Sequence, residues 1–401
     1  MDVELVFRRL REVLGEPTAF VPLHEPRLDG HAHEYVASCL DSGWVSTVGA
    51  FVDRFERELA AYLGASHVVA TVNGTAALQL ALLVAGVRSG DHVLIPTLTF
   101  VATANAVHAC GAVPHFVDVT ERTLGLDPQA LDAYLTIAAE RRDGGTFDRA
   151  SGRRIAACVP MHTFGHPVEM DDLMAVCARW GIPIVEDAAE SLGSTLHGRH
   201  AGTIGRLGIL SFNGNKILTT GGGGAIVTDD ETLARRAKHL STTAKLPHPY
   251  RFDHDEPAFN YRMPNLNAAL GVAQLERLDA AVEEKRHLAS VYQEAFSDVE
   301  GVRVFVEPHG ARSNYWLNAL LLDVPDEAAR DGLLERTNAA GIMTRPAWTQ
   351  MHRLSMYADA PRMDTPVSDA LVASIINVPS SPALAARADA WRSTAGAPIP
   401  R

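Results

Sequence analysis

Two shortages narrow what this chain can do. Its 401 residues include only four cysteines, Cys39, Cys110, Cys158 and Cys177, and no two of them have the C-x-x-C spacing. This pattern favours a reduced, cytoplasmic setting. No apolar run approaches the ~20 residues of a membrane span, and the N-terminus is charged where a signal peptide is apolar. We therefore expect no membrane association.

Positive charge and metal-ligand spacings are also scarce. The formal net charge is −12, which argues against a general surface for nucleic acid or anionic membrane. The 17 histidines include the pairs His31/His33 and His162/His166, but neither pair has an acidic partner in a known ligand spacing such as H-E-x-x-H. The nucleotide P-loop pattern is missing too. We expect no metal site.

Apolar residues are plentiful, at 47% of the chain, and their pattern predicts an α/β fold. Short strand-like runs alternate with helical stretches, which indicates a mainly parallel sheet covered by helices. The expected strands are 68–72, 92–95, 115–119, 155–160, 182–186, 207–212 and 225–228. The polar, glycine-containing segment 140–153 is expected to be a loop.

The same patterns predict two domains. Val6, Phe7, Leu10 and Leu14 have helical spacing, so residues 3–14 are expected to form an amphipathic helix. A helix-rich segment, 267–296, leads into a smaller part with expected strands at 302–306 and 317–322. We predict an N-terminal helix and arm (1–30), a large domain (31–270) and a small C-terminal domain (271–401).

Lys216 is the most informative residue. It follows the expected strand 207–212 and precedes four consecutive glycines, Gly221 to Gly224, which allow the backbone to approach a flat ligand closely. Such a lysine can form a Schiff base with pyridoxal phosphate if other groups hold the ring and the phosphate. The sequence contains candidates for each of those groups.

Asp187 is the candidate partner of the pyridine nitrogen. It ends the short apolar run 182–187, so its carboxylate is expected at the carboxyl edge of a parallel sheet, where α/β proteins place ligands. By itself an aspartate at such a position is more commonly a turn or helix-capping residue. The presence of Lys216 29 residues later favours the cofactor role.

A phosphate cradle is expected at the start of the helix that follows strand 68–72. Gly74, Thr75 and Ala76 open that helix, whose N-terminal N–H groups and dipole favour an anion. The same pattern also occurs as ordinary helix capping. Ser211, just before the lysine, offers a second hydroxyl to the same phosphate.

Phe100 is the candidate ring to stack on the cofactor. It follows the expected strand 92–95. A phenylalanine at a strand end is commonly a core residue. Because the sequence also contains Lys216, Asp187 and the phosphate cradle, stacking on the cofactor is the favoured role of Phe100.

Longer segments carry a resemblance that runs through nearly the whole chain. They include DSGWVS (41–46), PMHTFGHP (160–167), VEDAAESLG (185–193), SFNGNK (211–216) and NYRMPN (260–265). In this order they resemble the sugar-nucleotide aminotransferases of the DegT/StrS superfamily. The resemblance implies a fold-type-I transferase like aspartate aminotransferase, with a mainly parallel central sheet and a smaller C-terminal α+β domain, which uses pyridoxal 5'-phosphate.

Within that superfamily, several segments of this sequence are most similar to the LegC-type enzymes of legionaminic and related nonulosonic acid pathways. This likeness rests on TVNGT (71–75), the segments 160–166 and 211–216, STTAK (241–245) and SNYWLN (313–318). It implies transfer of an amino group from L-glutamate to C4 of a nucleotide-linked 4-keto-6-deoxy-hexose, with UDP or GDP and a 2-acetamido sugar expected. Two alternatives stay open: a C3-keto-sugar aminotransferase, and a non-catalytic ligand-binding protein on the same scaffold.

The resemblance also implies residue roles. Lys216 carries the cofactor and shuttles the proton, Asp187 meets the pyridinium, Phe100 stacks, and Gly74, Thr75, Ala76 and Ser211 hold the phosphate. Asn260 is implied to reach the cofactor of a second subunit, so that a homodimer shares its active sites. Glu190 faces the phenolic oxygen of the cofactor; most of the superfamily has glutamine there, and a carboxylate must be protonated or offset.

Four further residues are candidates for substrate contact. Trp44 and Ser46 are expected near the sugar nucleotide, with packing of the N-terminal region as the alternative. His162 is expected near the sugar or cofactor edge, or else as a core histidine. Arg262 is expected to meet a phosphate or the donor carboxylate, or to form a salt bridge at an interface. Retention of lysine at position 216, where histidine marks the dehydratase branch, favours amino transfer.

Overall fold

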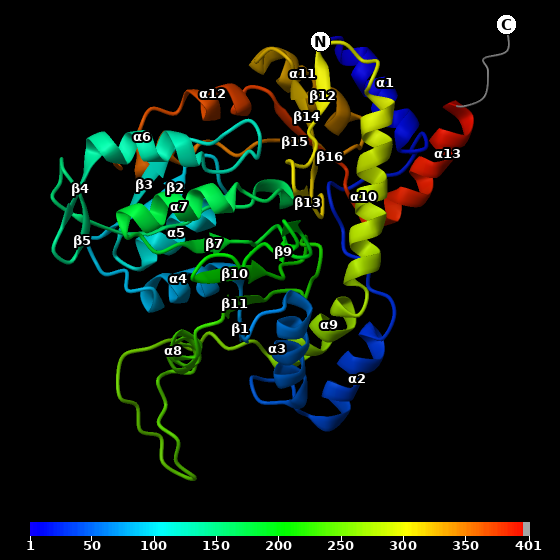
Figure 1. Ribbon diagram of the computed structural model, residues 1–401. Coiled ribbons are helices and arrows are strands. Elements are labelled where there is room, and N and C mark those ends of the chain that lie inside the picture. The colour runs from blue at the N-terminus through cyan, green and yellow to red at the C-terminus, as the bar shows by residue number, and fades with distance from the viewer. Residues whose placement is uncertain (396–401) are drawn as a thin grey trace, which may run out of the picture.

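The computed structural model of the protein describes residues 1–395, and its centre is a sheet whose strands come from two hydrogen-bonded groups (Figure 1). The first group, in spatial order, is β1 (His67–Thr71), β11 (Gly224–Thr228), β10 (Leu207–Ser211) and β7 (Val185–Asp187). The second is β3 (Val113–Val117), β2 (His92–Pro96), β6 (Arg154–Cys158), β5 (Gly145–Asp148) and β4 (Ala139–Arg142).

Isolated parallel bridges join the two groups into one surface. Cys158 pairs with Ile184, and Met161 pairs with Asp187, so β6 continues alongside β7. The pairs β2–β3, β2–β6 and β7–β10 are parallel, whereas β11 is antiparallel to both of its neighbours. All seven strands expected from the sequence are present, in a mainly parallel order.

Helices cover both faces of this sheet. Leu94 and Ile95 of β2 are consecutive and therefore point to opposite faces. Ile95 lies in the cluster that contains residues of α4, α5 and α8, whereas Leu94 packs with residues of α6 and α7. These helices are α4 (Gly74–Val84), α5 (Val101–Ala109), α6 (Pro128–Ala138), α7 (Met170–Trp180) and α8 (Glu231–Ser241). A third cluster packs α3 (Ala50–Leu63) and α9 (Asn265–Leu275) near β1.

A second, antiparallel sheet forms the C-terminal part. Its order is β12 (Val302–Val304), β14 (Asn318–Leu322), β16 (Ile375–Val378) and β15 (Arg345–Pro346). Its surroundings include α1 (Val3–Val13), α11 (Glu327–Ala339), α12 (Pro366–Val372) and α13 (Ala385–Ala395). The remaining elements are α2 (Ala32–Ser42), the small sheet of β8 (Thr195–Leu196), β9 (Arg199–His200) and β13 (Ala311–Arg312), and four short 3₁₀ turns at 163–165, 351–353, 355–357 and 382–384.

The expected N-terminal helix is present as α1 and packs on the C-terminal sheet. Asp2 caps it by accepting from the N–H groups of Glu4 and Leu5. Val6, Phe7 and Leu10 are buried with residues of β14 and β16. The long helix α10 (Leu278–Ala295) contributes to two cores, because its first turns pack with α3 and α9 and its later turns with α1 and β14.

Segment 140–153 corrects one expectation. It was expected to be a loop, but β4 and β5 form an antiparallel hairpin with Arg142 opposite Gly145. The turn is Asp143–Gly144, and Gly144 has a φ of +93°. Asp-Gly is a strong hairpin signal, and the polar residues around it concealed the strands.

None of the helices in residues 1–395 combines the length and apolar character that crossing a bilayer requires.

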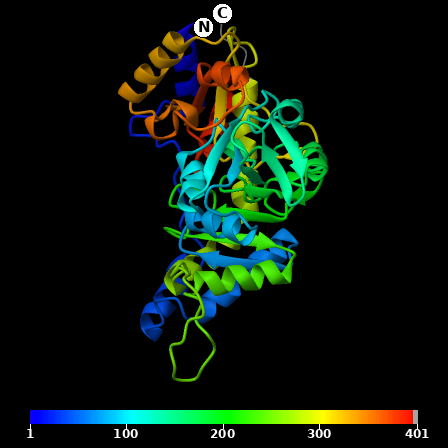
Figure 2. The same cartoon turned by 90° about the vertical axis from the view of Figure 1, so that its left-hand side faces the viewer.

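Figures 1 and 2 show that the segment after α8 projects from the body in both views. Asn260 lies at the base of this projection, where it bridges to Thr242.

Candidate active site

A cavity of about 630 Å³ opens at the carboxyl ends of the large sheet. Asp187 ends β7, Ser211 ends β10, and Phe100 follows β2, so three strand ends deliver side chains to it. The residues expected from the sequence that line it are Gly74, Thr75, Phe100, Asp187, Glu190, Ser211 and Lys216.

Lys216 reaches the cavity from the turn after β10. Its N–H donates to the carbonyl of Asn213, and its Nζ lies 3.2 Å from Oε1 of Glu190. The same Nζ lies 3.8 Å from the centre of the Trp316 ring, a cation–π contact. The amine is therefore held between a carboxylate and an aromatic face.

Asp187 is a buried carboxylate that has no ion-pair partner within residues 1–395. Its Oδ2 accepts from the hydroxyl of Thr103 at 2.7 Å, and its Oδ1 accepts from the N–H of Ala189 at 3.2 Å. Burial raises its pKa, and these two hydrogen bonds oppose the rise. A cationic ring nitrogen placed against it would supply the missing counter-charge.

Glu190 is buried beside the lysine. Burial raises its pKa to about 7, although the charge of Lys216 and the N–H of Phe164, 2.9 Å from Oε2, both act to lower it. Glu190 is therefore poised to change protonation near neutral pH.

The start of α4 forms an anion cradle. The first N–H groups of a helix have no partner within it, and Asn73 Oδ1 accepts only that of Ala76, at 2.8 Å. Those of Gly74 and Thr75 are left for a ligand. A Cβ on Gly74 would meet Ser211 Cβ at 2.9 Å, so glycine brings the helix start and β10 together. Ala76 was also expected to bind the phosphate, but its N–H donates to Asn73 and the residue does not line the cavity.

Glycine is required again on the neighbouring strand. A Cβ on Gly224 would meet the backbone carbon of Asn73 at 2.5 Å. The glycine run after Lys216 therefore lets β11 pass directly beneath the cradle.

Aromatic side chains form one wall. Phe100 is 49% exposed and lies 6.4 Å, centre to centre, from Trp348, which in turn lies 5.0 Å from Phe164. Phe100 is therefore free to stack on a flat ligand, which a core phenylalanine is not.

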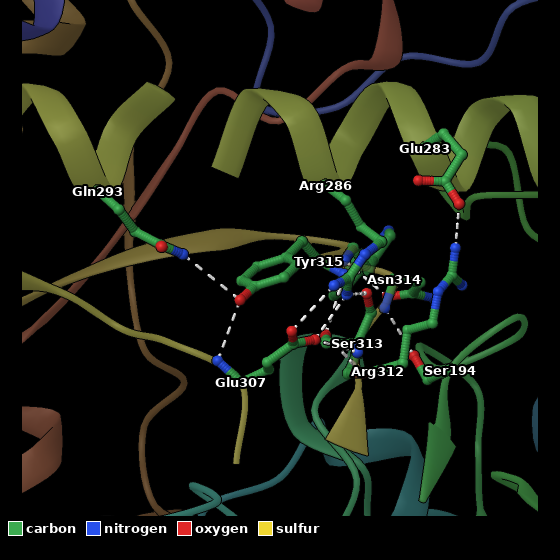
Figure 3. A network of polar contacts seen from close by, with 11 residues as sticks. Ser194, Glu283, Arg286, Gln293, Glu307, Arg312, Ser313, Asn314 and Tyr315 are labelled. Carbon is green, nitrogen blue, oxygen red and sulfur yellow. Dashed lines mark hydrogen bonds and ion pairs between the residues drawn. The ribbon is translucent and has the colours of Figure 1, made fainter. Parts of the chain in front are cut away.

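A polar network holds Ser313, Asn314 and Tyr315 (Figure 3), the three residues that precede Trp316 in the chain. Asn314 donates to the carbonyls of Glu190 and Leu192, each at 2.9 Å, and accepts from the N–H of Trp316 at 2.8 Å. Tyr315 in turn accepts from the N–H of Glu307 at 3.0 Å. The network joins Glu190 and Trp316, the two neighbours of Lys216 Nζ.

Six of the expected residues do not line this cavity: Ala76, His162 and four others, Trp44, Ser46, Asn260 and Arg262. Trp44 is 58% exposed. The backbone carbonyls of Trp44 and Ser46 both accept hydrogen bonds from Asn265. Arg262 donates to the hydroxyl of Thr47 at 2.7 Å. Asn260 is exposed at the base of the projecting segment. Arg262 Nε is buried without a partner among the described residues. Trp44, Ser46, Asn260 and Arg262 make a second, separate patch.

His162 lies in the core, which is the second of the two positions expected for it, and does not line the cavity. It is fully buried; its Nε2 is 3.0 Å from Glu186 Oε2, and its Nδ1 accepts from Val168 N at 3.1 Å. With both ring nitrogens bonded away from the cavity, it organises the strand-end loop.

Sequence reasoning missed several lining residues from the C-terminal part, among them Trp316, Arg345 and Trp348. Trp316 belongs to a quoted segment, 313–318, which could have pointed to it. Arg345 and Trp348 follow no local motif that would have singled them out. Thr103, the hydroxyl partner of Asp187, lies in α5 where its spacing from the aspartate carries no signal.

Comparisons with known proteins agree with this geometry. The family model described as the DegT/DnrJ/EryC1/StrS aminotransferase family matches residues 26–390. GDP-perosamine synthase from Vibrio cholerae is 34% identical over 365 residues, which cover 91% of this chain and 95% of that protein. The putative pyridoxal phosphate-dependent aminotransferase EpsN from Bacillus subtilis (strain 168) is 36% identical over 338 residues and 84% of each chain.

A solved structure shows the same fold. The aminotransferase TlmJ from Streptoalloteichus hindustanus superposes with a TM-score of 0.82 at 27% identity, over 94% of this chain and 100% of that chain. The fold-type-I architecture expected from the sequence is thereby confirmed.

Proposed function

This chain belongs to the DegT/DnrJ/EryC1/StrS aminotransferase family, whose enzymes are pyridoxal-phosphate-dependent sugar aminotransferases, and we propose that it aminates C4 of a nucleotide-linked 4-keto-6-deoxy-hexose with L-glutamate as the donor. Within the family we propose the LegC-type group, on the likeness of segments 160–166, 211–216 and 313–318. The product would then serve nonulosonic acid or surface-glycan biosynthesis.

The observation that carries the proposal is the meeting of Lys216, Asp187 and the start of α4 in one cavity. Pyridoxal phosphate, when bound, supplies the electron sink that allows an amino group to leave one carbon and join another. In our proposal Asp187 holds the protonated ring nitrogen, Gly74, Thr75 and Ser211 bind the phosphate, and Phe100 covers the ring.

Lys216 has two proposed tasks. Its amine attaches the cofactor at rest, and after release it moves a proton between the reacting carbons. Glu190 at 3.2 Å is placed to exchange a proton with that amine or with the phenolic oxygen of the cofactor. A pKa of about 7 allows it to be neutral when that oxygen carries negative charge.

Arg345 supports an amino-acid donor. Among the lining residues it and Lys216 are the cationic ones, and Lys216 is committed to the cofactor. We propose that Arg345 binds a carboxylate of L-glutamate, since a guanidinium matches a carboxylate in a bidentate geometry.

The second patch supports a shared active site. Trp44, Ser46, Asn260 and Arg262 lie outside the cavity of their own chain, and Trp44 is exposed. We propose that a homodimer brings this patch of one subunit to the cavity of the other, where Asn260 reaches the phosphate and the others meet the sugar nucleotide.

Two finer points of the proposal concern the nucleotide and the location of the protein. The relative named GDP-perosamine synthase favours GDP as the nucleotide, whereas the LegC-type likeness also admits UDP. The four cysteines are buried and form no disulfide, which supports a cytoplasmic location.

The first test is a half-reaction followed by absorbance. Purified protein is loaded with pyridoxal phosphate, and spectra are recorded before and after L-glutamate. Wild type should lose the absorption of the lysine-bound cofactor. Lys216→Ala and Lys216→Arg cannot attach the cofactor, so neither should show that absorption or a change of this kind on adding glutamate; the arginine variant keeps the positive charge. If the wild-type spectrum does not respond to glutamate, the proposed donor is wrong.

The second test locates the new nitrogen. The aminated enzyme is mixed with GDP- and UDP-linked 4-keto and 3-keto sugars, and the product is examined by NMR. Nitrogen at C4 supports the proposal, whereas nitrogen at C3 replaces it with the C3-keto-sugar reaction.

A further inference from the structure

Three buried side chains meet at the sheet edge opposite the cavity. His92 begins β2, His115 lies in β3, and Asp148 ends β5. Their exposed fractions are 3%, 0% and 4%. The cavity lies at the carboxyl ends of the strands, whereas His92 and Asp148 lie at the edge where β2 and β6 begin. The group is therefore separate from the proposed active site.

Their ligand atoms are close enough for one metal ion. One side-chain nitrogen or oxygen from each residue lies within 4.8 Å of the other two. The Nδ1 atoms of His92 and His115 lie 3.2 Å apart. Two nitrogens bound at about 2.0–2.1 Å in a tetrahedral zinc site lie about 3.3 Å apart, so the imidazoles already have the spacing of two ligands on one ion.

Neighbouring groups orient two of the three ligands. The other ring nitrogen of His115, Nε2, lies 2.7 Å from the hydroxyl of Tyr134, which can hold the ring with the Nδ1 lone pair directed toward His92. Asp148 Oδ2 accepts from the N–H of Ser151 at 2.8 Å and from its hydroxyl at 2.5 Å. Metal ligands in proteins are commonly held by such outer partners.

The charges at this edge suit a cation. Asp148 has no arginine or lysine partner within 4 Å among the described residues. Arg154 forms its ion pair with a neighbouring carboxylate, Asp91. Imidazole binds a metal ion in its neutral form, so neither histidine would neutralise Asp148 in the proposed site. Asp148 is then left as an anion without a matching cation.

We propose that His92, His115 and Asp148 bind one divalent transition-metal ion of the zinc class, with water completing the coordination. Two imidazoles and a carboxylate favour zinc over magnesium or calcium. Because the ligands come from β2, β3 and β5, the ion ties the β4–β5 hairpin to the sheet. Its role is structural. No sequence spacing reveals it, since the ligands lie 23 and 33 residues apart.

The test is zinc binding by untagged holoenzyme after dialysis against EDTA. Equilibrium dialysis with elemental analysis should find one Zn²⁺ per wild-type chain, and Co²⁺ should give the absorption bands of a four-coordinate site. His115→Gln keeps a polar group near Tyr134 but removes the Nδ1 ligand, and Asp148→Asn keeps an acceptor for Ser151. Both variants should lose the ion.

A matched control is available within the chain. His239, Asp255 and Glu256 also lie within reach of one ion, but they are more exposed and Glu256 is already paired with Arg236. His239→Gln should leave zinc uptake unchanged. Saturating Zn²⁺ should raise the Tm of wild type by roughly 2 °C or more and leave that of His115→Gln unchanged, while glutamate turnover stays the same in both.

The proposal fails if wild type takes up no stoichiometric zinc. It also fails if His239→Gln abolishes uptake while folded His115→Gln and Asp148→Asn retain it. Because the readouts are metal content and Tm, neither result depends on the aminotransferase proposal.

Discussion

The amine of Lys216 lies 3.2 Å from the carboxylate of Glu190, and that carboxylate is buried deeply enough to titrate near pH 7. The two residues are 26 positions apart and meet because β10 and the loop after β7 end at the same sheet edge. The protonation state of Glu190 is thereby coupled to the lysine that carries the proposed chemistry.

This coupling predicts a pH-dependent stability. The unfolded carboxyl ionises near 4.5 and the folded one near 7, so the folded state retains a proton that the unfolded state has released within this window. The free energy of unfolding should therefore fall as pH rises from about 4.5 to 7. Glu190→Gln cannot ionise, so its Tm relative to wild type should increase between pH 5 and pH 8. Replacing an exposed glutamate, as in Glu300→Gln, should leave the wild-type pH profile unchanged.

Trp316 should control the position of Lys216 Nζ, which lies 3.8 Å from its ring centre. A cation–π contact contributes about 1–2 kcal/mol, so Trp316→Ala should lower kcat about tenfold. Trp316→Phe keeps a ring face and should retain most of the activity. Steady-state kinetics with glutamate check this, with Trp180→Phe, on α7 away from the cavity, as the control. Equal losses in the alanine and phenylalanine variants would contradict a role for the ring face.

Thr103 should affect the affinity of the protein for pyridoxal phosphate through its hydrogen bond to Asp187. Its hydroxyl donates to Asp187 Oδ2 at 2.7 Å and lowers the pKa of that carboxyl. Thr103→Val removes this bond and should weaken pyridoxal phosphate binding about tenfold, since a hydrogen bond to a charged group contributes about 1.5–3 kcal/mol. Thr103→Ser should restore binding. Fluorescence titration of the apoenzyme measures both, and unchanged affinity in the valine variant would show that Asp187 does not depend on Thr103.

Two glycines of the run after Lys216 should behave differently. Gly224→Ala places a Cβ 2.5 Å from the backbone of Asn73, which cannot move without shifting the start of α4. We expect a loss of about 1–3 kcal/mol in stability and weaker cofactor binding. Gly222→Ala meets nothing within 4 Å, so it should change stability little. Denaturant unfolding separates the two cases, and similar losses in both variants would show that the close approach at Asn73 is not the cause.

Arg345 is the further residue to test at the donor site. Arg345→Gln should raise KM for glutamate by about tenfold while changing kcat less, because it removes a charge-assisted hydrogen bond of about 1.5–3 kcal/mol. Arg362→Gln, a surface arginine outside the lining, is the control. A fall in kcat alone would assign Arg345 to a different step.

The order of strands and helices and the strand-end positions of Asp187, Ser211 and Phe100 follow from local sequence. Apolar runs bounded by turn residues favour strands, a residue at the end of a parallel strand lies at the sheet's ligand-binding edge, and Asn73 is a favourable cap for the helix that begins at Gly74. These patterns depend on neighbours within a few positions, which is why the positions of Asp187 and Ser211 at the ends of strands, and of Lys216 in the turn after one, could be expected without a structure.

Other features depended on residues that are distant in the chain. Local sequence does not show that Glu190 contacts Lys216, that the Trp316 ring lies against the same amine, or that His162 bonds to Glu186 in the core. The meeting of His92, His115 and Asp148 is of the same kind. Short-range backbone preferences set the elements and the residues at their ends, whereas the packing of the helices and of the C-terminal sheet decides which distant side chains share a cavity, a charge or a ligand.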